Sequence, residues 1–290
     1  MRGCSCRGTA GFAHVSCLAE QAKILVEEAV ENNLGGKAIH TRFQRWHTCS
    51  LCEQHYHGLV YCALGWACWK TYVGRPETDV ARIMAMTTLG NGLYLAEHYE
   101  DALTVREAEL PTIRRLGTSE RHMFVAKSNL ASSYQRLGRL EEASRMLRDV
   151  YSGSVQFYGE EHRESLREAN NYANALHNLR RFKEVKALLR KMLPAAQRVL
   201  TDSHEITLKM RWTYASALHD DPSATLDDFR EAVTTLEDLG RVARRLLGPS
   251  HPLVEDSEKC LRNARATARA RELNVSSLAD ELEAMTPGDA

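Results

Sequence analysis

The chain has 290 residues, with 38 Lys and Arg against 38 Asp and Glu, and 43% of its residues are apolar. This composition excludes a collagen-like or largely disordered protein, because enough apolar side chains are present to form a core. The balanced charge argues against binding nucleic acid or an anionic membrane through an overall basic field. The length allows two domains, or one small module followed by a repeat array.

The cysteines are concentrated at the start of the chain, and after residue 68 only Cys260 follows. Residues 1–20 contain no apolar segment of the kind found in secretory signals, so we expect reduced thiols and a cytoplasmic or nuclear protein. The longest apolar stretch, residues 58–69, is about half of the roughly 20 residues that a membrane helix needs. A reduced cysteine cluster is more often a metal site than a disulfide framework.

Three pairs of residues near the N-terminus have the spacing of metal ligands. They are Cys4 and Cys6, His14 and Cys17, and Cys49 and Cys52. Zinc takes four thiolate or imidazole ligands in a tetrahedron, and one tight turn can present two ligands that are one or two residues apart. We therefore expect Zn²⁺ as the cofactor, although six ligands are too many for one ion and too few for two. Cys62, Cys68 and Cys260 lack paired spacing and are predicted to be packing residues.

The order of these pairs resembles the RING-CH (RING-variant) zinc finger. The resemblance lies in a Cys-x-Cys-x-Gly start, a His-x2-Cys-Leu segment, a helix from Leu18 to Asn33 in a stretch ending near Trp46, and a final Cys-x2-Cys. That family binds two zinc ions through four ligand pairs. Carried over to this chain, one complete site would consist of Cys4, Cys6, Cys49 and Cys52.

The other site of the finger is incomplete in this pattern. His14 and Cys17 match half of it, and its first ligand pair would lie before Met1. Three interpretations stay open. The chain is a fragment of a longer product, the module folds on one zinc ion, or local histidines complete the second site in another way; these are His47, His55 and His57.

From about Asp79 the sequence repeats itself. The motif that begins at Asn129 returns 42 residues later at Asn171, and further copies lie around Leu89 and Tyr214. Each copy contains a helix with a small residue near its middle, a short turn and a second helix with an apolar stripe. A five-residue insertion near Asp221 lengthens the last copy. The small residues are Gly90, Ala131, Ala173 and Ala215.

These helix-turn-helix repeats resemble the tetratricopeptide repeat (TPR) family, and their period resembles the longer kinesin-light-chain type. The resemblance implies an all-α fold, a right-handed superhelical array of TPR-like helix hairpins preceded by a small zinc-stabilised RING-variant module. We predict the zinc module at 1–57, a connecting apolar helix at 58–78, about four repeats at 79–271 and a flexible tail at 272–290. Histidines at the turns are predicted to be helix caps rather than ligands; they are His98, His122, His162, His204 and His251.

The resemblance implies a protein-protein interaction scaffold that binds a partner peptide in a groove lined by the first helices of the repeats. The groove residues would be Asn91, Tyr94, Ser128, Ser132, Gln135, Arg167, Asn170, Asn174, His177, Lys209, Trp212 and His219. Two of them, Arg167 and Lys209, would favour an acidic ligand, and an equally good interpretation is that both are solvated. No catalytic motif is found, and no catalytic residue is predicted.

An alternative function follows from the finger. RING-CH proteins resemble E3 ubiquitin-protein ligases, in which the finger recruits a ubiquitin-conjugating enzyme and another part, here the repeats, recruits the substrate. Trp46 would correspond to the aromatic residue presented to that enzyme. The missing first pair and the Ser50-Leu51 segment between the last ligands argue against this alternative. Whether the protein is an enzyme stays open at this point.

Overall fold

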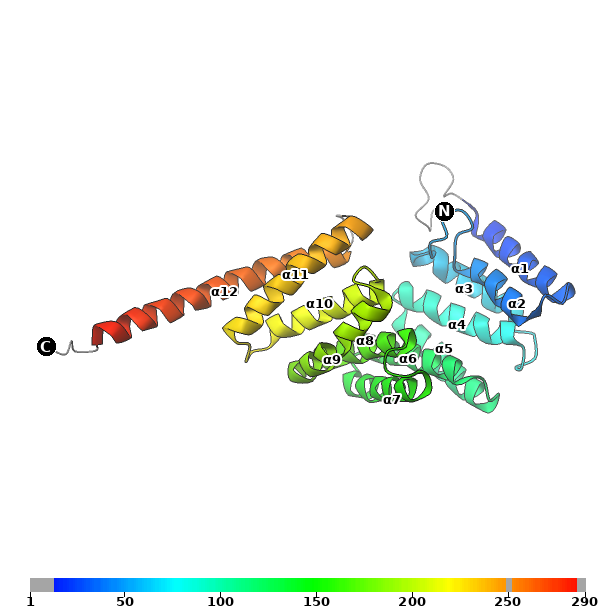
Figure 1. Ribbon diagram of the computed structural model, residues 1–290. Helices are drawn as coiled ribbons and strands as arrows, with labels where there is room; N and C mark the ends of the chain where they lie inside the picture. Colours follow the sequence, from blue (N-terminus) through cyan, green and yellow to red (C-terminus); the bar gives the residue numbers. More distant parts are fainter. Residues whose placement is uncertain (1–12, 249–251, 286–290) are drawn as a thin grey trace. The chain divides into compact units, whose positions relative to one another are not determined.

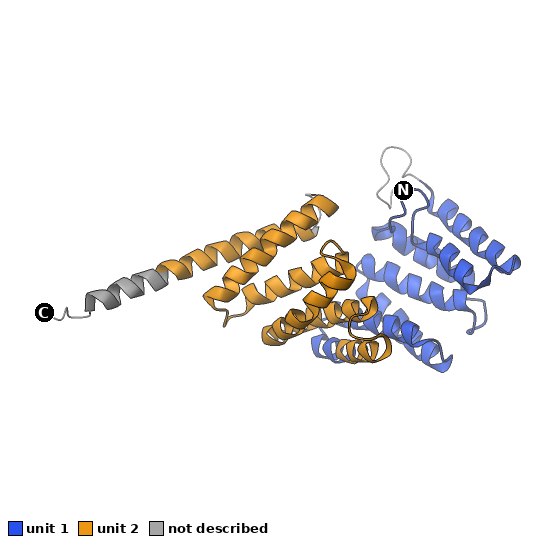
Figure 2. Ribbon diagram, viewed as in Figure 1, with its two compact units in different colours: residues 1–146 blue, residues 147–290 orange. Residues whose placement is uncertain are grey.

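The computed structural model describes residues 13–248 and 252–285, and these residues form α-helices connected by short turns. Thr48 and His55 form an isolated antiparallel bridge, and no strand is present in the described ranges. The chain divides into two compact units, residues 1–146 and 147–290 (Figure 2). Within the described residues, no helix combines the length and apolar character needed to cross a bilayer.

The helices follow one another as consecutive antiparallel hairpins (Figure 1). Unit 1 contains α1 (Val15–Glu31), α2 (Gly35–Phe43), the 3₁₀ helix η2 (Gln44–Trp46), α3 (Gly58–Tyr72), α4 (Val80–Leu95), α5 (Tyr99–Arg115) and α6 (Glu120–Arg136). The unit boundary falls within α7 (Leu140–Tyr158). Unit 2 continues with α8 (Arg163–Asn178), α9 (Phe182–Leu200), α10 (Glu205–Asp220), α11 (Leu226–Leu247) and α12 (Pro252–Met285).

The predicted repeats correspond to helix pairs. The first three hairpin turns place a residue with positive φ at the equivalent position, namely Glu97 (φ 65°), Gly138 (φ 77°) and Arg180 (φ 57°). A left-handed residue at this point ends the first helix and reverses the chain. The fourth turn is different because the insertion lengthens it.

Ion pairs secure the longer fourth turn. The buried carboxylate of Asp221 lies 2.9 Å from Nζ of Lys186 and accepts hydrogen bonds from the backbone N–H and the hydroxyl of Ser223. Asp228, on the first turn of α11, lies 3.5 Å from the same ammonium group. Lys186 belongs to α9, so the insertion is fixed to the preceding repeat by charge.

Small residues lie where helices cross in unit 2. Ala173 on α8 and Ala215 on α10 are fully buried, and Val185 and Ala232 occupy the matching positions on α9 and α11. The largest cluster of buried residues in this unit joins α8, α9 and α10. Their apolar stripes therefore form one continuous core, as expected for stacked helix hairpins.

Two glycines bring α3 and α4 unusually close together. A Cβ atom on Gly92 would lie 3.0 Å from Cα of Cys62 and from the carbonyl oxygen of Tyr61. A Cβ atom on Gly65 would lie 3.1 Å from the backbone of α4 at Leu89. The segment predicted to be a connecting helix is thus tightly packed against the first repeat.

The N-terminal helices enclose an apolar core. Phe43, Trp46 and Tyr72 are almost fully buried together with residues of α1 and α4. The aromatic rings of Trp46 and Tyr72 meet edge to face with centroids 6.0 Å apart. Because Trp46 has no exposed surface, it cannot be the aromatic residue presented to a conjugating enzyme, as the RING-CH resemblance implied.

Several local predictions can be checked against individual side chains. His162 and His204 are confirmed as N-caps, since Nδ1 of each accepts a backbone N–H from the first turn of α8 or α10. Cys62 and Cys68 are confirmed as buried packing residues. The helix α12 continues to Met285, beyond the position where a tail was expected to begin. His251 lies outside the described residues.

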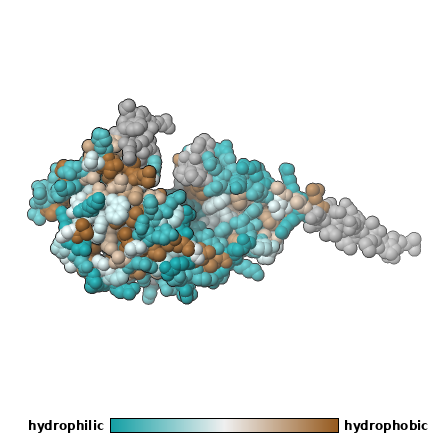
Figure 3. Space-filling model, turned by 180° about the vertical axis from the view of Figure 1, so that it is seen from behind, coloured by the Kyte–Doolittle hydropathy of each residue, from teal (hydrophilic) through white to brown (hydrophobic). Residues whose placement is uncertain are grey.

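Charged side chains cover much of the surface. On the face seen in Figure 3, hydrophilic residues predominate and hydrophobic residues form smaller areas between them. Many of the charges form ion pairs within one helix or between neighbouring helices, such as Arg181 with Glu184 and Arg230 with Glu272. Exposed pairs of this type contribute little to stability, about 0–1 kcal/mol each.

Candidate functional site

The first helices of the last two repeats, α8 and α10, pack against each other and carry a connected set of polar side chains. Thr213 donates its hydroxyl proton to the side-chain oxygen of Asn174 over 2.8 Å. At the C-terminal end, Asp220 lies 3.2 Å from Nε2 of His177 and 2.7 Å from Nδ1 of His219. Hydrogen bonds from these two imidazoles hold the pKa of Asp220 well below its usual range.

Two buried polar atoms on this face have neither a hydrogen-bond partner nor an ion pair in the described part of the chain, unlike Nε2 of His177, which lies beside Asp220. They are Oδ1 of Asn170 and Oγ of Ser216. Helical spacing places Asn170 one turn before Asn174, and Ser216 between Thr213 and Asp220, on the same side of each helix. A buried acceptor without a partner costs about 1–3 kcal/mol, which marks these atoms as candidates for ligand contacts. Ser216 was not among the groove residues predicted from the sequence.

The two cations predicted for the groove already have acidic partners. Arg167 lies 2.6 Å from Glu164 and donates to Glu168, whose carboxylate is fully buried. Lys209 lies 2.5 Å from Glu205 on the same helix. These pairs neutralise the positive charge that an acidic ligand would need, so the polar face offers mainly amide, hydroxyl and imidazole groups.

Trp212 is positioned away from this set. Its side chain packs against the apolar cluster that joins α10, α11 and α12. The spacing along α10 explains the placement, because residue 212 lies about 100° from Thr213 around the helix axis. Of the predicted groove residues in unit 2, the structure therefore brings Asn170, Asn174 and His177 to one face, and His219 is joined to this set only through Asp220.

In unit 1, Asn91 occupies the repeat position that matches Asn174, and its side chain bonds to a buried residue. Asn91 accepts a 3.0 Å hydrogen bond from the guanidinium of Arg106, which also donates to Ser133 and to the carbonyl oxygen of Asn129. Arg106 is only 3% exposed, and burial lowers its pKa to about 10. A buried guanidinium needs acceptors, and Asn91 is one of them. Arg106 also lies over the ring of Tyr94, 4.7 Å from its centroid.

The candidate metal ligands lie on one turn and on the start of α1. In the turn, the backbone N–H of Leu51 donates to Sγ of Cys49 over 3.4 Å, and the N–H of Cys49 donates to the carbonyl oxygen of Gln54. Cys49 is buried and Cys52 is half-buried. Cys49 belongs to an apolar cluster against which Cys52 and the α1 residues Val15 and Leu18 also pack.

The other predicted pair is exposed. Sγ of Cys17 lies 3.9 Å from Nδ1 of His14 at the start of α1. Cys4 and Cys6 lie outside the described residues, and within the described ones no three His, Cys, Asp or Glu side chains form a metal site. His47 and His55 stack with ring centroids 5.3 Å apart. Burial, reinforced by the nearby imidazoles of His55 and His40, lowers the pKa of His47 to about 4.

Comparison with known proteins finds one family model and solved structures that this chain is similar to. A tetratricopeptide repeat model matches residues 125–164, and no curated protein matches. Among solved structures, the chain is similar to the nearly identical TPR-like repeats of a kinesin light chain from Podosopora anserina, with a TM-score of 0.51, 15% identity, and 81% and 98% of the two chains covered. It also resembles BtubC (BKLC) from P. vanneervenii, with a TM-score of 0.47, 15% identity and 96% of each chain covered. The first similarity shows a TPR-like helical-repeat fold.

Proposed function

We propose that this TPR-like chain is a protein-protein interaction scaffold that binds a partner peptide on the α8–α10 polar face. The observation that carries the proposal is that Oδ1 of Asn170 and the hydroxyl of Ser216, on either side of the Asn174–Thr213 hydrogen bond, are buried and have no partner among the residues that the structure describes. Backbone N–H groups of an extended peptide would supply the missing donors. Each such bond is worth about 0.5–1.5 kcal/mol.

The chemistry of the face favours recognition of peptide backbone over recognition of charge. Arg167 and Lys209 are neutralised by neighbouring carboxylates, so acidic side chains gain little from them. The amide of Asn174 and the histidines around Asp220 remain as hydrogen-bonding groups along the face. We therefore expect a ligand of low net charge.

The test starts from a random peptide library displayed on phage and selected on the full chain. The enriched peptide is then titrated by isothermal calorimetry. Asn170→Leu should weaken binding about tenfold, because the peptide loses one buried hydrogen bond to this side chain. Asn263→Leu, an exposed change on α12, is the matched control. Equal affinities of the two variants would contradict the proposal, provided that both retain their helical circular dichroism.

We further propose that the first part of the chain is a RING-variant-like module that binds zinc through Cys4, Cys6, Cys49 and Cys52. The Cys49–Cys52 turn supports this, because it presents two sulfur atoms and directs an amide proton at one of them. Bound zinc would link Cys4 and Cys6 to Cys49 and Cys52 and contribute folding free energy. His14 and Cys17 would be half of a second site.

Metal analysis tests the zinc module. Protein purified without chelator should contain close to one zinc ion per chain, and Cys49→Ser with Cys52→Ser should abolish it. Cys62→Ser, at a buried cysteine away from the turn, should leave the zinc content unchanged. No zinc in the unmodified protein would refute the assignment. The burial of Trp46 provides no support for a conjugating-enzyme partner, so ligase activity is not proposed.

A further inference from the structure

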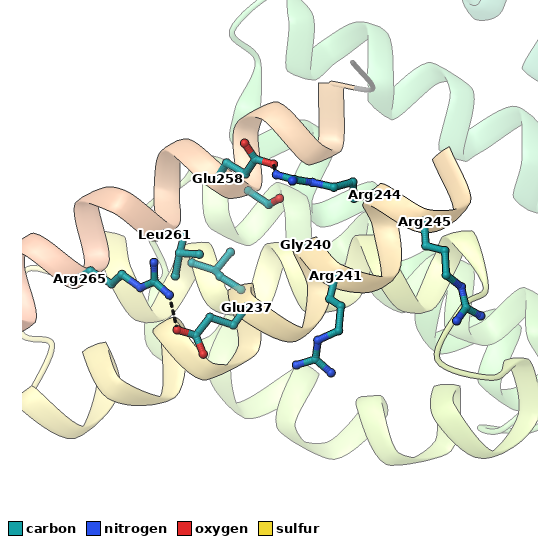
Figure 4. A pocket seen from close by; sticks show the side chains of 10 residues that line it. Glu237, Gly240, Arg241, Arg244, Arg245, Glu258, Leu261 and Arg265 are labelled. Carbon is teal, nitrogen blue, oxygen red and sulfur yellow. Dashed lines mark hydrogen bonds and ion pairs between the residues drawn. The ribbon is translucent and has the colours of Figure 1, made fainter. Parts of the chain in front are cut away.

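The last two helices, α11 and α12, enclose a cleft of about 520 Å³. Its floor consists of Leu236, Gly240, Ser257 and Leu261, and four arginines and two glutamates surround it (Figure 4). Leu236 and Ser257 have almost no exposed surface. The cleft therefore combines an apolar and small-residue floor with a rim of net positive charge.

The repeat pattern explains why this cleft exists. Positions 240 and 257 correspond to Leu193 and Met210, which lie 47 residues earlier in the helix pair α9–α10. Met210 is fully buried and Leu193 packs against the same core, so large side chains fill the seam in that pair. In α11–α12 a glycine and a serine replace them. A Cβ atom on Gly240 would have only Oγ of Ser257 nearby, at 3.9 Å.

Two ion pairs connect the helices across the cleft. Arg265 lies 2.6 Å from Glu237, and Arg244 pairs with Glu258 (Figure 4). Each pair joins α11 to α12, and together they account for both glutamates of the rim. The other two rim arginines pair with no residue of the rim, although Arg241 contacts Asp238 outside it.

Arg241 and Arg245 lie one turn apart on the α11 side of the cleft, and both side chains extend away from α12 (Figure 4). Arg241 contacts Asp238, yet 75% of its side chain is exposed. Arg245 is exposed and forms no ion pair with a residue that the structure describes. Two guanidinium groups with this spacing can bind two carboxylates of one peptide.

We propose that the α11–α12 cleft binds an acidic peptide segment of a partner protein that carries one apolar side chain between carboxylates. The apolar side chain would occupy the space over Gly240 and Leu261, and the carboxylates would pair with Arg241 and Arg245. This site is separate from the α8–α10 polar face, and its ligand is acidic, whereas the ligand of the polar face is expected to have a low net charge. The proposal therefore goes beyond the proposed function and does not depend on it.

Fluorescence anisotropy with designed peptides tests the cleft on the full chain. The probe is a fluorescein-labelled peptide of Asp and Glu residues around a single Leu. One companion has Gly in place of Leu, and a second has Asn and Gln in place of the acidic residues. The probe should bind more tightly than both companions. Its affinity should fall with added salt, since exposed charges are screened.

Three variants assign the binding to the cleft. The double change Arg241→Glu with Arg245→Glu should weaken binding about tenfold, because two exposed attractions become repulsions. Lys183→Glu, an exposed charge reversal on α9, is its control and should have no effect. Gly240→Leu should fill the cleft with a side chain, as Leu193 does between α9 and α10. This variant should therefore bind the Leu peptide and the Gly peptide equally.

The outcomes that overturn the proposal are distinct from a failure of the α8–α10 polar face. Asn170→Leu should leave probe binding unchanged, and a loss there would move the site to that face. No binding of the probe, or equal binding by the arginine and Lys183 variants, would refute the cleft. Binding that needs the arginines but shows no Leu preference, or that occurs only with anionic lipid vesicles, would also refute it. If Gly240→Leu lost helicity, the arginine variants and peptide companions would still decide.

Discussion

Replacing Gly92 by Ala should destabilise the protein, whereas the same change two residues earlier, at Gly90, should stabilise it. Both glycines lie inside α4, where Ala is favoured over Gly by about 0.8–1.0 kcal/mol. The added methyl groups meet different surroundings. At Gly90 the nearest atoms would be side-chain carbons of Arg106 and Val105 on α5, at 3.4 and 3.5 Å, which is ordinary contact.

At Gly92 the methyl group would lie 3.0 Å from backbone atoms of Tyr61 and Cys62 on α3. Backbone cannot turn aside as a side chain can, so the two helices must separate. Overpacking of this kind costs about 1–3 kcal/mol. The helix-propensity gain is the same in both variants and cancels in their comparison. Gly92→Ala should therefore be less stable than Gly90→Ala by about 1–3 kcal/mol.

Thermal unfolding followed by circular dichroism measures this difference. For a chain of this size, 1 kcal/mol shifts the Tm by roughly 2–4 °C. Gly65→Ala, on the opposite side of the same seam, should behave like Gly92→Ala, because its methyl group would meet the backbone of Thr88 and Leu89 at 3.1 Å. If Gly92→Ala were as stable as Gly90→Ala, the close approach of α3 and α4 would be refuted.

Four further changes test other parts of the structure. Arg106→Met should lower the free energy of unfolding in urea by about 2–4 kcal/mol, since the buried acceptors on Ser133 and Asn91 lose their donor. An unchanged urea midpoint would exclude this hydrogen-bond network. Burial alone would raise the pKa of Asp221, but hydrogen bonds from Lys186 and Ser223 outweigh it and lower the pKa to about 2. A carboxyl group whose pKa is lowered by folding stabilises the fold at pH values above its unfolded pKa near 4. The free energy of unfolding should therefore fall by about 1 kcal/mol between pH 4 and 2. Lys186→Met should make this loss smaller. His204→Ala should cost about 1 kcal/mol and His204→Asn should restore most of it, whereas equal losses would exclude capping. Glu97→Gly should stabilise by about 1 kcal/mol by relieving a left-handed non-glycine residue, and a lower Tm would contradict this.

Periodic features could be predicted from the sequence because the same pattern occurs in each repeat. The helix hairpins, the turn at Gly138 and the capping of α8 and α10 by His162 and His204 all recur at fixed spacing, so local rules were sufficient. The repeat comparison also identified the α8 residues Asn170 and Asn174. Their shared face follows from the helical period alone.

Contacts between particular side chains could not be predicted from the sequence. Nothing in the repeat pattern marks Arg106 as buried, because its burial depends on acceptors from α4 and α6. The pairing of Arg167 with Glu168 was equally hidden, because adjacent charges on a helix usually point apart. Trp46 was assigned from a family resemblance, and the apolar core of unit 1 enclosed it instead.

The ion cluster at the fourth turn limits how this array could change its length. Repeat genes lengthen by recombination between similar units, and a copied unit must fit a new neighbour. Lys186 in α9 is partly buried against Asp221 and Asp228 of the next repeat, while the positions that match it in α7 and α11 are Ser144 and Val233. A third repeat copied without the fourth would bury an ammonium group beside no carboxylate. The last two repeats should therefore be duplicated, lost or exchanged as one block.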